Sequence, residues 1–526
     1  ILIHALSLCC FNDWFLMAKA KGENPSPVRD YDILAAVDTQ PNPVMVQLNQ
    51  NFINTIAQEL PAHLSMDDFI AACSRPLRRS IRVNTLKISS EDFKRLMQPK
   101  GWTFAPIPWC EDGFWISYDE EEQLGNALEH IQGLFYIQEA SSMLPPTALF
   151  TPNADWQCVL DLASAPGSKT TQMAALMNNQ GLLVANEYSA SRVKVLHANV
   201  LRMGASHCAL THFDGRVFGE YLYESFDAVL IDAPCGGEGT VRKDADALKS
   251  WSLDEVIEIS ETQKALIESA FLALKPGGSL VYSTCTLNRH ENQGVCEYLQ
   301  QTYGDAVQFE SLSQLFDGAE KATTPEGFLH VWPQIYDSEG FFVAKLTKTR
   351  SVPRLQPEPK LQKNFPFTEA SAKQAKAIQA YFADDLGIEL PDDLIMVRDD
   401  EFWLFPHEFK DFIGKMRFQR IGVKLADHSK HGFKVRHEAI IALAGKALKA
   451  GAKNGAKVVE VSDEQAKEYL MGRDIPLDTA GKAQGEVIVC YGGAPLGMAK
   501  HLGNKLKNNL PRDLVKDKVL LLPPQA

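Results

Sequence analysis

The chain has 526 residues, of which 45% are hydrophobic and 23% charged, and its formal net charge at pH 7 is −13. This length exceeds what one hydrophobic core serves and predicts roughly three or four domains. The negative charge argues against a protein that coats nucleic acid indiscriminately, although it allows a local basic surface.

Two general features indicate where the protein works and how much of the chain folds. Ten cysteines without a CxxC pair or a Cys/His cluster indicate a reducing compartment and no metal site. The apolar stretch Ile1–Met17 lacks a basic n-region and is too short to span a membrane. The sequence starts without Met and Pro25–Pro43 has a linker-like composition, so Met45 is expected to be the true start and residues 1–44 a disordered extension. We therefore expect a cytoplasmic monomer without membrane contact.

Residues 45–133 mix helical and strand patterns and predict a small α+β domain. The segment 75–87 within it, RPLRRSIRVNTLK, carries five positive charges and no acid. Such a basic strand suits contacts with phosphates, whereas a solvated face with salt bridges explains it as well.

Residues 134–349 alternate between strand and helix patterns. This alternation predicts an α/β domain with a mostly parallel, doubly wound sheet. The expected strands are Cys158–Leu162, Leu182–Asn186, His207–Leu210, Ala228–Ile231, Ser279–Ser283 and Phe341–Leu346. A helix is expected to stop at the segment Leu274–Ser279. The expected helices lie near Lys169–Met177, Ala190–Met203, Glu261–Leu274 and Glu291–Thr302.

Residues 350–368 are rich in proline and charge and predict a linker. Beyond it we expect a middle α+β region over 369–430 and a C-terminal domain over 431–526. The middle region is expected to hold a helix over Ser371–Ala383 and strands over Leu394–Phe405 and Phe418–Leu425. The C-terminal domain is expected to hold a strand over Val487–Tyr491, followed by lysines at positions 500, 505 and 507.

Two stretches each place a cysteine at the end of an expected buried strand. Cys235 lies in FDAVLIDAPCGGEGT, and Cys285 lies in VYSTCTLNRHEN. A single cysteine of this kind is most often an ordinary core residue. Parallel strands end at the same edge of a sheet, where open α/β folds bind their ligands. The pair of cysteines, rather than either one alone, therefore indicates a site.

Small residues and acids follow the other expected strands at this edge of the sheet. Residues 161–171 read DLASAPGSKTT, and their single glycine argues against both a dinucleotide fingerprint and a P-loop. Glu187, Asp214 and Asp232 follow the second, third and fourth strands. One such acid is usually a surface or capping residue, but several acids along one edge favour a nucleoside ligand.

These motifs resemble those of the S-adenosylmethionine-dependent RNA 5-methylcytosine methyltransferases. The resemblance rests on DLASAPGSKT, DAPCGGEGT, STCTLNRHEN and the preceding stretch YIQEASSMLP. With the basic segment and the long C-terminal half, the chain is similar to the 16S ribosomal RNA methyltransferase F type of bacteria, from Met45 to its end. The resemblance implies a Rossmann-like class I methyltransferase core, an N-terminal RNA-binding domain and a PUA-like C-terminal domain that binds RNA.

The resemblance also implies roles for individual residues. The loop around the methionine part of S-adenosylmethionine would consist of Ala163, Ser164, Ala165, Pro166, Gly167, Ser168 and Lys169. Glu187 would hold the ribose hydroxyls, and Asp214 would meet the adenine edge. Asp232 would lie between the cofactor and the target base. Ser168 stands where relatives often have a second adjacent glycine, and we expect cofactor binding to survive this difference.

The chemistry of methylation at carbon 5 explains why such groups are needed. This carbon of cytosine is a poor nucleophile until a thiolate adds at carbon 6. By the resemblance, Cys285 is that nucleophile, Cys235 assists release of the adduct, and Asp232 acts at N3 of the base. Spacing alone leaves the two cysteine roles open, since DNA cytosine methyltransferases attack with the cysteine of a Pro-Cys motif.

The implied substrate is 16S ribosomal RNA within the 30S subunit. A transfer RNA methyltransferase of the same family is the first alternative, because the catalytic motifs do not encode the substrate. A non-catalytic RNA-binding assembly factor is the second, and the intact cysteines argue against it. The missing GxGxxG pattern disfavours an NAD(P)-linked dehydrogenase.

Overall fold

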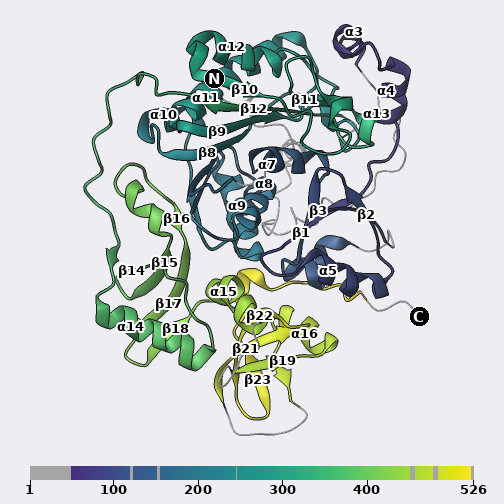
Figure 1. Cartoon of the computed structure of the whole chain (residues 1–526). Helices are drawn as coiled ribbons and strands as arrows, with labels where there is room; N and C mark the ends of the chain where they lie inside the picture. The colour runs from purple at the N-terminus through teal and green to yellow at the C-terminus, as the bar shows by residue number, and fades with distance from the viewer. Residues whose placement is uncertain are drawn as a thin grey trace, which may run out of the picture.

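The computed structural model describes residues 49–118, 123–150, 154–244, 246–449, 457–477 and 484–522. The expected extension over 1–44 and the expected start at Met45 lie outside these residues. Four β-sheets organise the described chain, with four, nine, five and five strands. In Figure 1 the nine-stranded sheet and its helices lie at the top, and the two five-stranded sheets lie below them.

The N-terminal part combines helices with an antiparallel sheet of order β2-β3-β1-β4. Three of its helices begin after a polar capping residue, namely α3 (Gln50–Glu59) after Asn49, α4 (Met66–Cys73) after Ser65 and α5 (Ser90–Met97) after Ser89. The strands are β1 (Ser80–Val83), β2 (Thr103–Ile107), β3 (Cys110–Ser117) and β4 (Phe135–Ile137). The aromatic rings of Phe93, Trp102 and Phe135 pack together in the core beneath this sheet.

The nine-stranded sheet confirms the expected mostly parallel, doubly wound fold. Its order is β10-β12-β9-β8-β5-β6-β7-β16, and β11 pairs with β12. The pairs from β9 to β7 run parallel, and the outer pairs run antiparallel. The strands are β5 (Cys158–Asp161), β6 (Leu182–Asn186), β7 (Cys208–Thr211), β8 (Phe226–Asp232), β9 (Leu274–Thr284), β10 (Val307–Glu310), β11 (Leu329–Val331), β12 (Phe341–Lys348) and β16 (Arg420–Ile421).

The strand order reverses direction between β5 and β8, which is where open α/β sheets bind their ligands. Helices cover both faces of the sheet and bury a separate apolar cluster on each (Figure 1). The helices of this part are α7 (Leu144–Leu149), α8 (Ser168–Leu176), α9 (Ala190–Met203), α10 (Phe218–Tyr221), α11 (Leu253–Ala273), α12 (Gln293–Tyr303) and α13 (Pro333–Tyr336).

Two expectations about this sheet were wrong at their boundaries. We expected a helix to stop within Leu274–Ser279 and a strand to begin at Ser279. The strand β9 instead begins at Leu274, because Leu274 pairs with Phe226 of β8. The helix expected from Glu261 begins at Leu253, because the hydroxyl of Ser252 accepts the N–H of Glu255 at 3.3 Å and caps an earlier turn.

The middle region also differs from the expected pattern. The stretch 394–405 is a hairpin rather than one strand, because Asp399 adopts a φ of 53° and turns the chain. The stretch 418–425 is divided at Gly422, which has a φ of 56°. Its first half is β16, in which Arg420 lies opposite Leu210 at the edge of the nine-stranded sheet. The elements of this region are β13 (Thr368–Glu369), α14 (Ala372–Ala380), β14 (Leu394–Arg398), β15 (Glu401–Phe405), β17 (Val423–Ser429), β18 (Gly432–Val435) and α15 (His437–Lys449).

After the last sheet, the chain runs back to the N-terminal part of the protein. Its elements are β19 (Val458–Glu460), α16 (Asp463–Leu470), β20 (Ile475–Pro476), β21 (Gly485–Tyr491), β22 (Ala494–His501) and β23 (Lys505–Asn508). The backbone of Leu520 then donates to the carbonyl of Asn126 at 2.8 Å and accepts from the N–H of Leu128 at 3.1 Å. Leu522 joins the apolar cluster around Phe93, so the C-terminal end of the described chain packs against the N-terminal α+β part.

Among the described residues, no helix is long and apolar enough to cross a membrane. The same part of the chain holds no group of three or more His, Cys, Asp or Glu side chains placed to bind a metal ion.

Candidate active site

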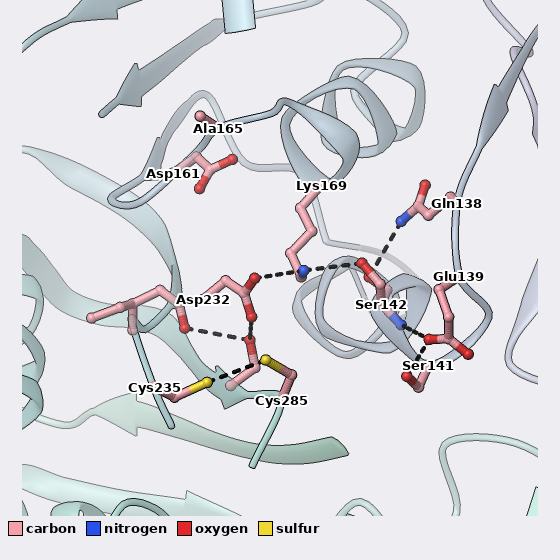
Figure 2. A network of polar contacts seen from close by, with 12 residues as sticks. Gln138, Glu139, Ser141, Ser142, Asp161, Ala165, Lys169, Asp232, Cys235 and Cys285 are labelled. Carbon is pink, nitrogen blue, oxygen red and sulfur yellow. Dashed lines mark hydrogen bonds and ion pairs between the residues drawn. The ribbon is translucent and has the colours of Figure 1, made fainter. Parts of the chain in front are cut away.

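The carboxyl ends of three neighbouring parallel strands converge on one point of the nine-stranded sheet. Strand β5 ends at Asp161, β8 ends at Asp232, and β9 ends just before Cys285. Asp232 lies opposite Ser283 in the register of β8 and β9. The sheet thus gathers residues that are far apart in the sequence, and Figure 2 shows them around a common centre.

The two cysteines singled out in the sequence lie together at this centre. Their sulfur atoms are 3.2 Å apart, and one thiol donates a hydrogen bond to the other (Figure 2). Cys235 is 5% exposed, whereas Cys285 is more accessible to solvent. The backbone also joins their loops, because Gly239 N–H donates to the carbonyl of Cys285 at 2.9 Å.

Asp232 and Lys169 form a partly buried ion pair beside the cysteines. Lys169 Nζ lies 2.7 Å from Asp232 Oδ2, and Ser283 Oγ donates to Asp232 Oδ1 at 2.9 Å. Lys169 comes from the first turn of α8, in the loop expected to hold the cofactor. Figure 2 shows its ammonium directed toward Asp232 and away from the rest of that loop. The site therefore has a fixed positive charge next to the acid.

Ser142 is a member of this network that the sequence patterns did not single out. Its hydroxyl accepts from Lys169 Nζ at 3.0 Å. Glu139 holds it in place, because Glu139 Oε2 accepts the N–H of Ser142 at 3.2 Å (Figure 2). Both residues lie in YIQEASSMLP, which the family resemblance included, but nothing in their local pattern predicts a contact with a lysine 27 positions away.

The loop expected to bind the cofactor is held closely against Glu187. Glu187 is 4% exposed; its Oε2 accepts the N–H of Ala165 at 3.2 Å, and its Oε1 accepts the N–H of Ser189 at 2.8 Å. Gly167 adopts a φ of 105° just before α8 begins. A Cβ at Gly167 would strain this backbone and lie 3.1 Å from Leu196 Cδ1, which explains the single glycine of the loop.

Asp161, at the base of this loop, has an unsatisfied buried oxygen. The residue is 0% exposed, and its Oδ2 accepts from Thr170 Oγ1 at 2.6 Å. Its Oδ1 has no hydrogen-bond partner. Burial raises the pKa of the Asp161 carboxyl to about 7. An orphaned acceptor beside a turn of small residues fits a ligand that brings a hydrogen-bond donor, such as an ammonium group.

Asp214 stands on the same edge of the sheet but already has an internal partner. Arg216 binds its carboxylate with Nε at 3.0 Å from Oδ1 and with a terminal nitrogen at 2.6 Å from Oδ2. The hydrogen bond with Arg216 lowers the pKa of Asp214. A ligand at this position would share the carboxylate with the guanidinium group.

Two of the five cations of the basic segment 75–87 are held inside the protein, which limits the expected phosphate contacts to Arg75, Arg78 and Arg79. Arg82 is 2% exposed and donates to Gln138 Oε1 and Thr171 Oγ1, each at 2.9 Å. Lys87 Nζ donates to two backbone carbonyls at 2.6 Å. These two cations tie the N-terminal sheet to the helices α8 and α9, so they serve the fold.

Four family models match successive parts of the chain. They are "16S rRNA methyltransferase RsmB/F" over residues 147–347, "N-terminal domain of 16S rRNA methyltransferase RsmF" over 48–140, "Ribosomal RNA small subunit methyltransferase F, pre-PUA domain" over 367–443 and "Methyltransferase RsmF PUA domain" over 456–516.

Curated relatives and solved structures agree with these matches. The chain is 99% identical over 482 residues to "Ribosomal RNA small subunit methyltransferase F" of Shewanella sp. (strain ANA-3), covering 92% of this chain and 100% of that protein. The protein of the same name from Shewanella oneidensis is 92% identical over the same shares. A crystal structure of a methyltransferase homolog protein from Pyrococcus horikoshii has 31% identity and a TM-score of 0.50, covering 62% of this chain and 100% of that one.

A second solved structure, NSun6 from Pyrococcus horikoshii with SFG, has 21% identity and a TM-score of 0.51, covering 59% of this chain and 100% of that one. It supports the fold alone, a class I methyltransferase core. The four successive matches and the near-identical relatives together show that the chain belongs to the family of ribosomal RNA small subunit methyltransferase F, enzymes that methylate small-subunit ribosomal RNA.

Proposed function

We propose that the protein transfers a methyl group from S-adenosylmethionine to carbon 5 of a cytosine in 16S ribosomal RNA. The observation that carries this proposal is the pair of thiols, 3.2 Å apart and next to Asp232. Methylation of a ring nitrogen or a ribose hydroxyl has no use for two sulfur atoms. Methylation at carbon 5 needs one sulfur to add to the ring and a second group to help the adduct leave.

The loop 163–169 would hold the methionine part of the cofactor, Glu187 the ribose hydroxyls and Asp214 the adenine edge. The orphaned Oδ1 of Asp161 supports this assignment, because the cofactor's amino group is the kind of donor that it lacks. When bound, S-adenosylmethionine supplies an electrophilic methyl group on a sulfonium. The structure of NSun6 from Pyrococcus horikoshii was solved with SFG, which is consistent with a cofactor site in this fold.

Cys285 is the nucleophile in our proposal. Its sulfur attacks carbon 6 of the base, and the electron pair of the C5–C6 bond becomes available at carbon 5 for the methyl group. The accessible thiol is better placed to reach a base than the more buried Cys235. Attack requires the thiolate form of Cys285, so its thiol proton leaves before the S–C6 bond forms.

Charge develops on the pyrimidine ring during this attack, and the Lys169–Asp232 pair is placed to balance it. N3 of cytosine has a lone pair and no hydrogen, so Asp232 would pass a proton to N3 as negative charge builds there, and the ammonium of Lys169 would supply positive charge nearby. The sulfur of Cys235, as a thiolate, then takes the proton of carbon 5, the electron pair of the S–C6 bond returns to the sulfur of Cys285, and the N3 proton returns to Asp232, which restores the aromatic ring. Cys235 assists this last step.

The substrate in our proposal is 16S ribosomal RNA assembled in the 30S subunit, modified by a monomer. A transfer RNA methyltransferase with the same catalytic residues is the alternative within the family. Methylation of isolated 30S subunits, naked 16S RNA and transfer RNA by the purified protein separates the two. Incorporation into transfer RNA alone would exclude the ribosomal substrate.

The roles of the cysteines are tested with wild type, Cys235→Ala and Cys285→Ala. Each is incubated with S-adenosylmethionine and 30S subunits and then run on denaturing gels. We expect a slow-migrating protein–RNA adduct with Cys235→Ala and neither adduct nor methyl transfer with Cys285→Ala. An adduct confined to Cys285→Ala would reverse the roles, and wild-type turnover by Cys285→Ala would rule out Cys285 as the nucleophile.

A further inference from the structure

Two buried glutamates join the loops that carry the cysteines. We call residues 233–240 the first cysteine loop and residues 285–292 the second cysteine loop. Glu238 belongs to the first loop and Glu291 to the second, and both are 0% exposed. Buried carboxylates are expensive unless they are fully hydrogen-bonded, so their partners show what they stabilise.

Glu238 reaches from the first cysteine loop into the second. Its Oε2 accepts from the hydroxyl of Thr286 at 2.7 Å and from the N–H groups of Leu287 and Asn288, each at 2.9 Å. Its Oε1 accepts from the amide of Asn288 at 2.9 Å and from the indole N–H of Trp251 at 2.6 Å. The carboxylate thus satisfies backbone donors that have no strand or helix partner, and such charge-assisted bonds are strong.

Glu291 makes the reverse connection. Its Oε2 accepts the N–H of Gly236, the residue after Cys235, at 2.9 Å, and the amide of Gln263 at 2.8 Å. Its Oε1 accepts from the amide of Asn288 at 2.7 Å. A Cβ at Gly236 would lie only 2.9 Å from this oxygen, so the two loops are in close contact here.

Neither glutamate belongs to the polar network that contains Asp232 and Lys169. Each accepts from backbone N–H groups that follow a cysteine, Glu238 from Leu287 and Asn288 and Glu291 from Gly236, so they act through the position of the loops. Each loop has an acid that binds the backbone of the other, and the thiols lie at the junction between them. The separation of the sulfurs therefore depends on both carboxylates.

We propose that Glu238 and Glu291 are positioning residues that form a reciprocal lock between the cysteine loops and keep both thiols on one reacting base. The effect of the lock on catalysis rests on the proposed carbon 5 reaction. Its effect on the distance between the two sulfurs is independent of that reaction. Glu291 holds the backbone beside Cys235, so its loss displaces the thiol that assists release. Attack by Cys285, at the end of the long strand β9, is affected less.

The geometric part is tested without RNA or cofactor. Phenylarsine oxide binds two thiols at once and releases water, and intact-protein mass spectrometry follows its capture in wild type, Glu238→Gln and Glu291→Gln. We expect capture in both glutamine variants to be slowed by about tenfold, because a displaced second thiol has a lower effective concentration. Cys235→Ala shows which part of the signal belongs to this pair.

A matched control comes from Glu59, which also binds the second cysteine loop but does not join it to the first. Its Oε2 accepts the N–H of Arg289 at 2.7 Å from the helix α3. Glu59→Gln should capture the arsenical at the wild-type rate. Gly236→Ala is a second probe, since its methyl group presses on Glu291 without removing a carboxylate.

The catalytic part is read from the time course of methyl transfer to 30S subunits. Glu291→Gln should give a first turnover close to that of wild type, a kcat lowered by about 10²-fold, an unchanged KM and an accumulated protein–RNA adduct. Wild-type arsenical capture in Glu238→Gln, Glu291→Gln and Gly236→Ala would overturn the lock. A second outcome separates the two proposals. If the glutamine variants capture the arsenical slowly but Cys235→Ala forms no protein–RNA adduct, the lock is retained and the proposed reaction is rejected.

Discussion

Replacement of Arg82 by methionine tests whether this residue of the basic segment serves the fold or the RNA. Arg82 is 2% exposed and donates two hydrogen bonds of 2.9 Å, to Gln138 and Thr171. Bonds from a charged donor contribute about 1.5–3 kcal/mol each, and methionine offsets part of their loss because it needs no desolvation of a charge. We expect the free energy of unfolding to fall by about 2–3 kcal/mol. The melting temperature should fall by roughly 4–10 °C.

The same variant should weaken cofactor binding. Arg82 also approaches the carbonyl of Ser168 at 3.4 Å, so it ties the start of α8 and the loop before it to β1. Scanning calorimetry measures the loss of stability, and titration calorimetry measures the affinity for S-adenosylmethionine. Arg78→Met is the control: its guanidinium carbon lies 3.9 Å from the ring centroid of Trp115, and its loss should change stability by less than about 1 kcal/mol. Unchanged stability with weaker RNA binding by Arg82→Met would refute the structural role and restore the phosphate contact.

Three further tests concern charge at the site and on the last sheet. The pKa of Asp161 is raised to about 7, so between its unfolded value and pH 7 the folded state binds more protons and stability falls as pH rises. Asp161→Asn should flatten this dependence in denaturant unfolding between pH 5 and 8, and an identical slope would contradict the burial argument. Lys169→Met should lower the single-turnover rate by about 10²–10³-fold, because its ammonium faces Asp232. The affinity for S-adenosylmethionine should stay the same, because only the backbone of Lys169 belongs to the cofactor loop. A loss of affinity would show that the Lys169 side chain binds the cofactor. Lys500 and Lys507 are exposed and lie directly opposite each other on β22 and β23. Changing both to glutamate should weaken RNA binding and reduce the slope of log K against log salt concentration by roughly 1.5. An unchanged slope would show that the RNA binds elsewhere.

The elements of the central sheet could be predicted because their signal is local. The helix Ala190–Met203 and the strand Leu182–Asn186 have the expected bounds, since each has a continuous periodic pattern between clear boundary residues. Boundaries were wrong where pairing with a distant strand decided them. Leu274 joins β9 because Phe226 lies beside it, and the short strand β16 forms because Leu210 offers a free sheet edge to Arg420.

By itself, the sequence determined the alternation of strands and helices, the residues at the strand ends and the presence of two cysteines in the right motifs. Only the tertiary structure decided that the sulfurs lie 3.2 Å apart, that Lys169 faces Asp232 and that Arg82 is buried. The physical reason is that periodicity and capping act within a few residues along the chain. Distance, burial and the pairing of charges arise between residues that the chain brings together from far apart, so no local pattern contains them.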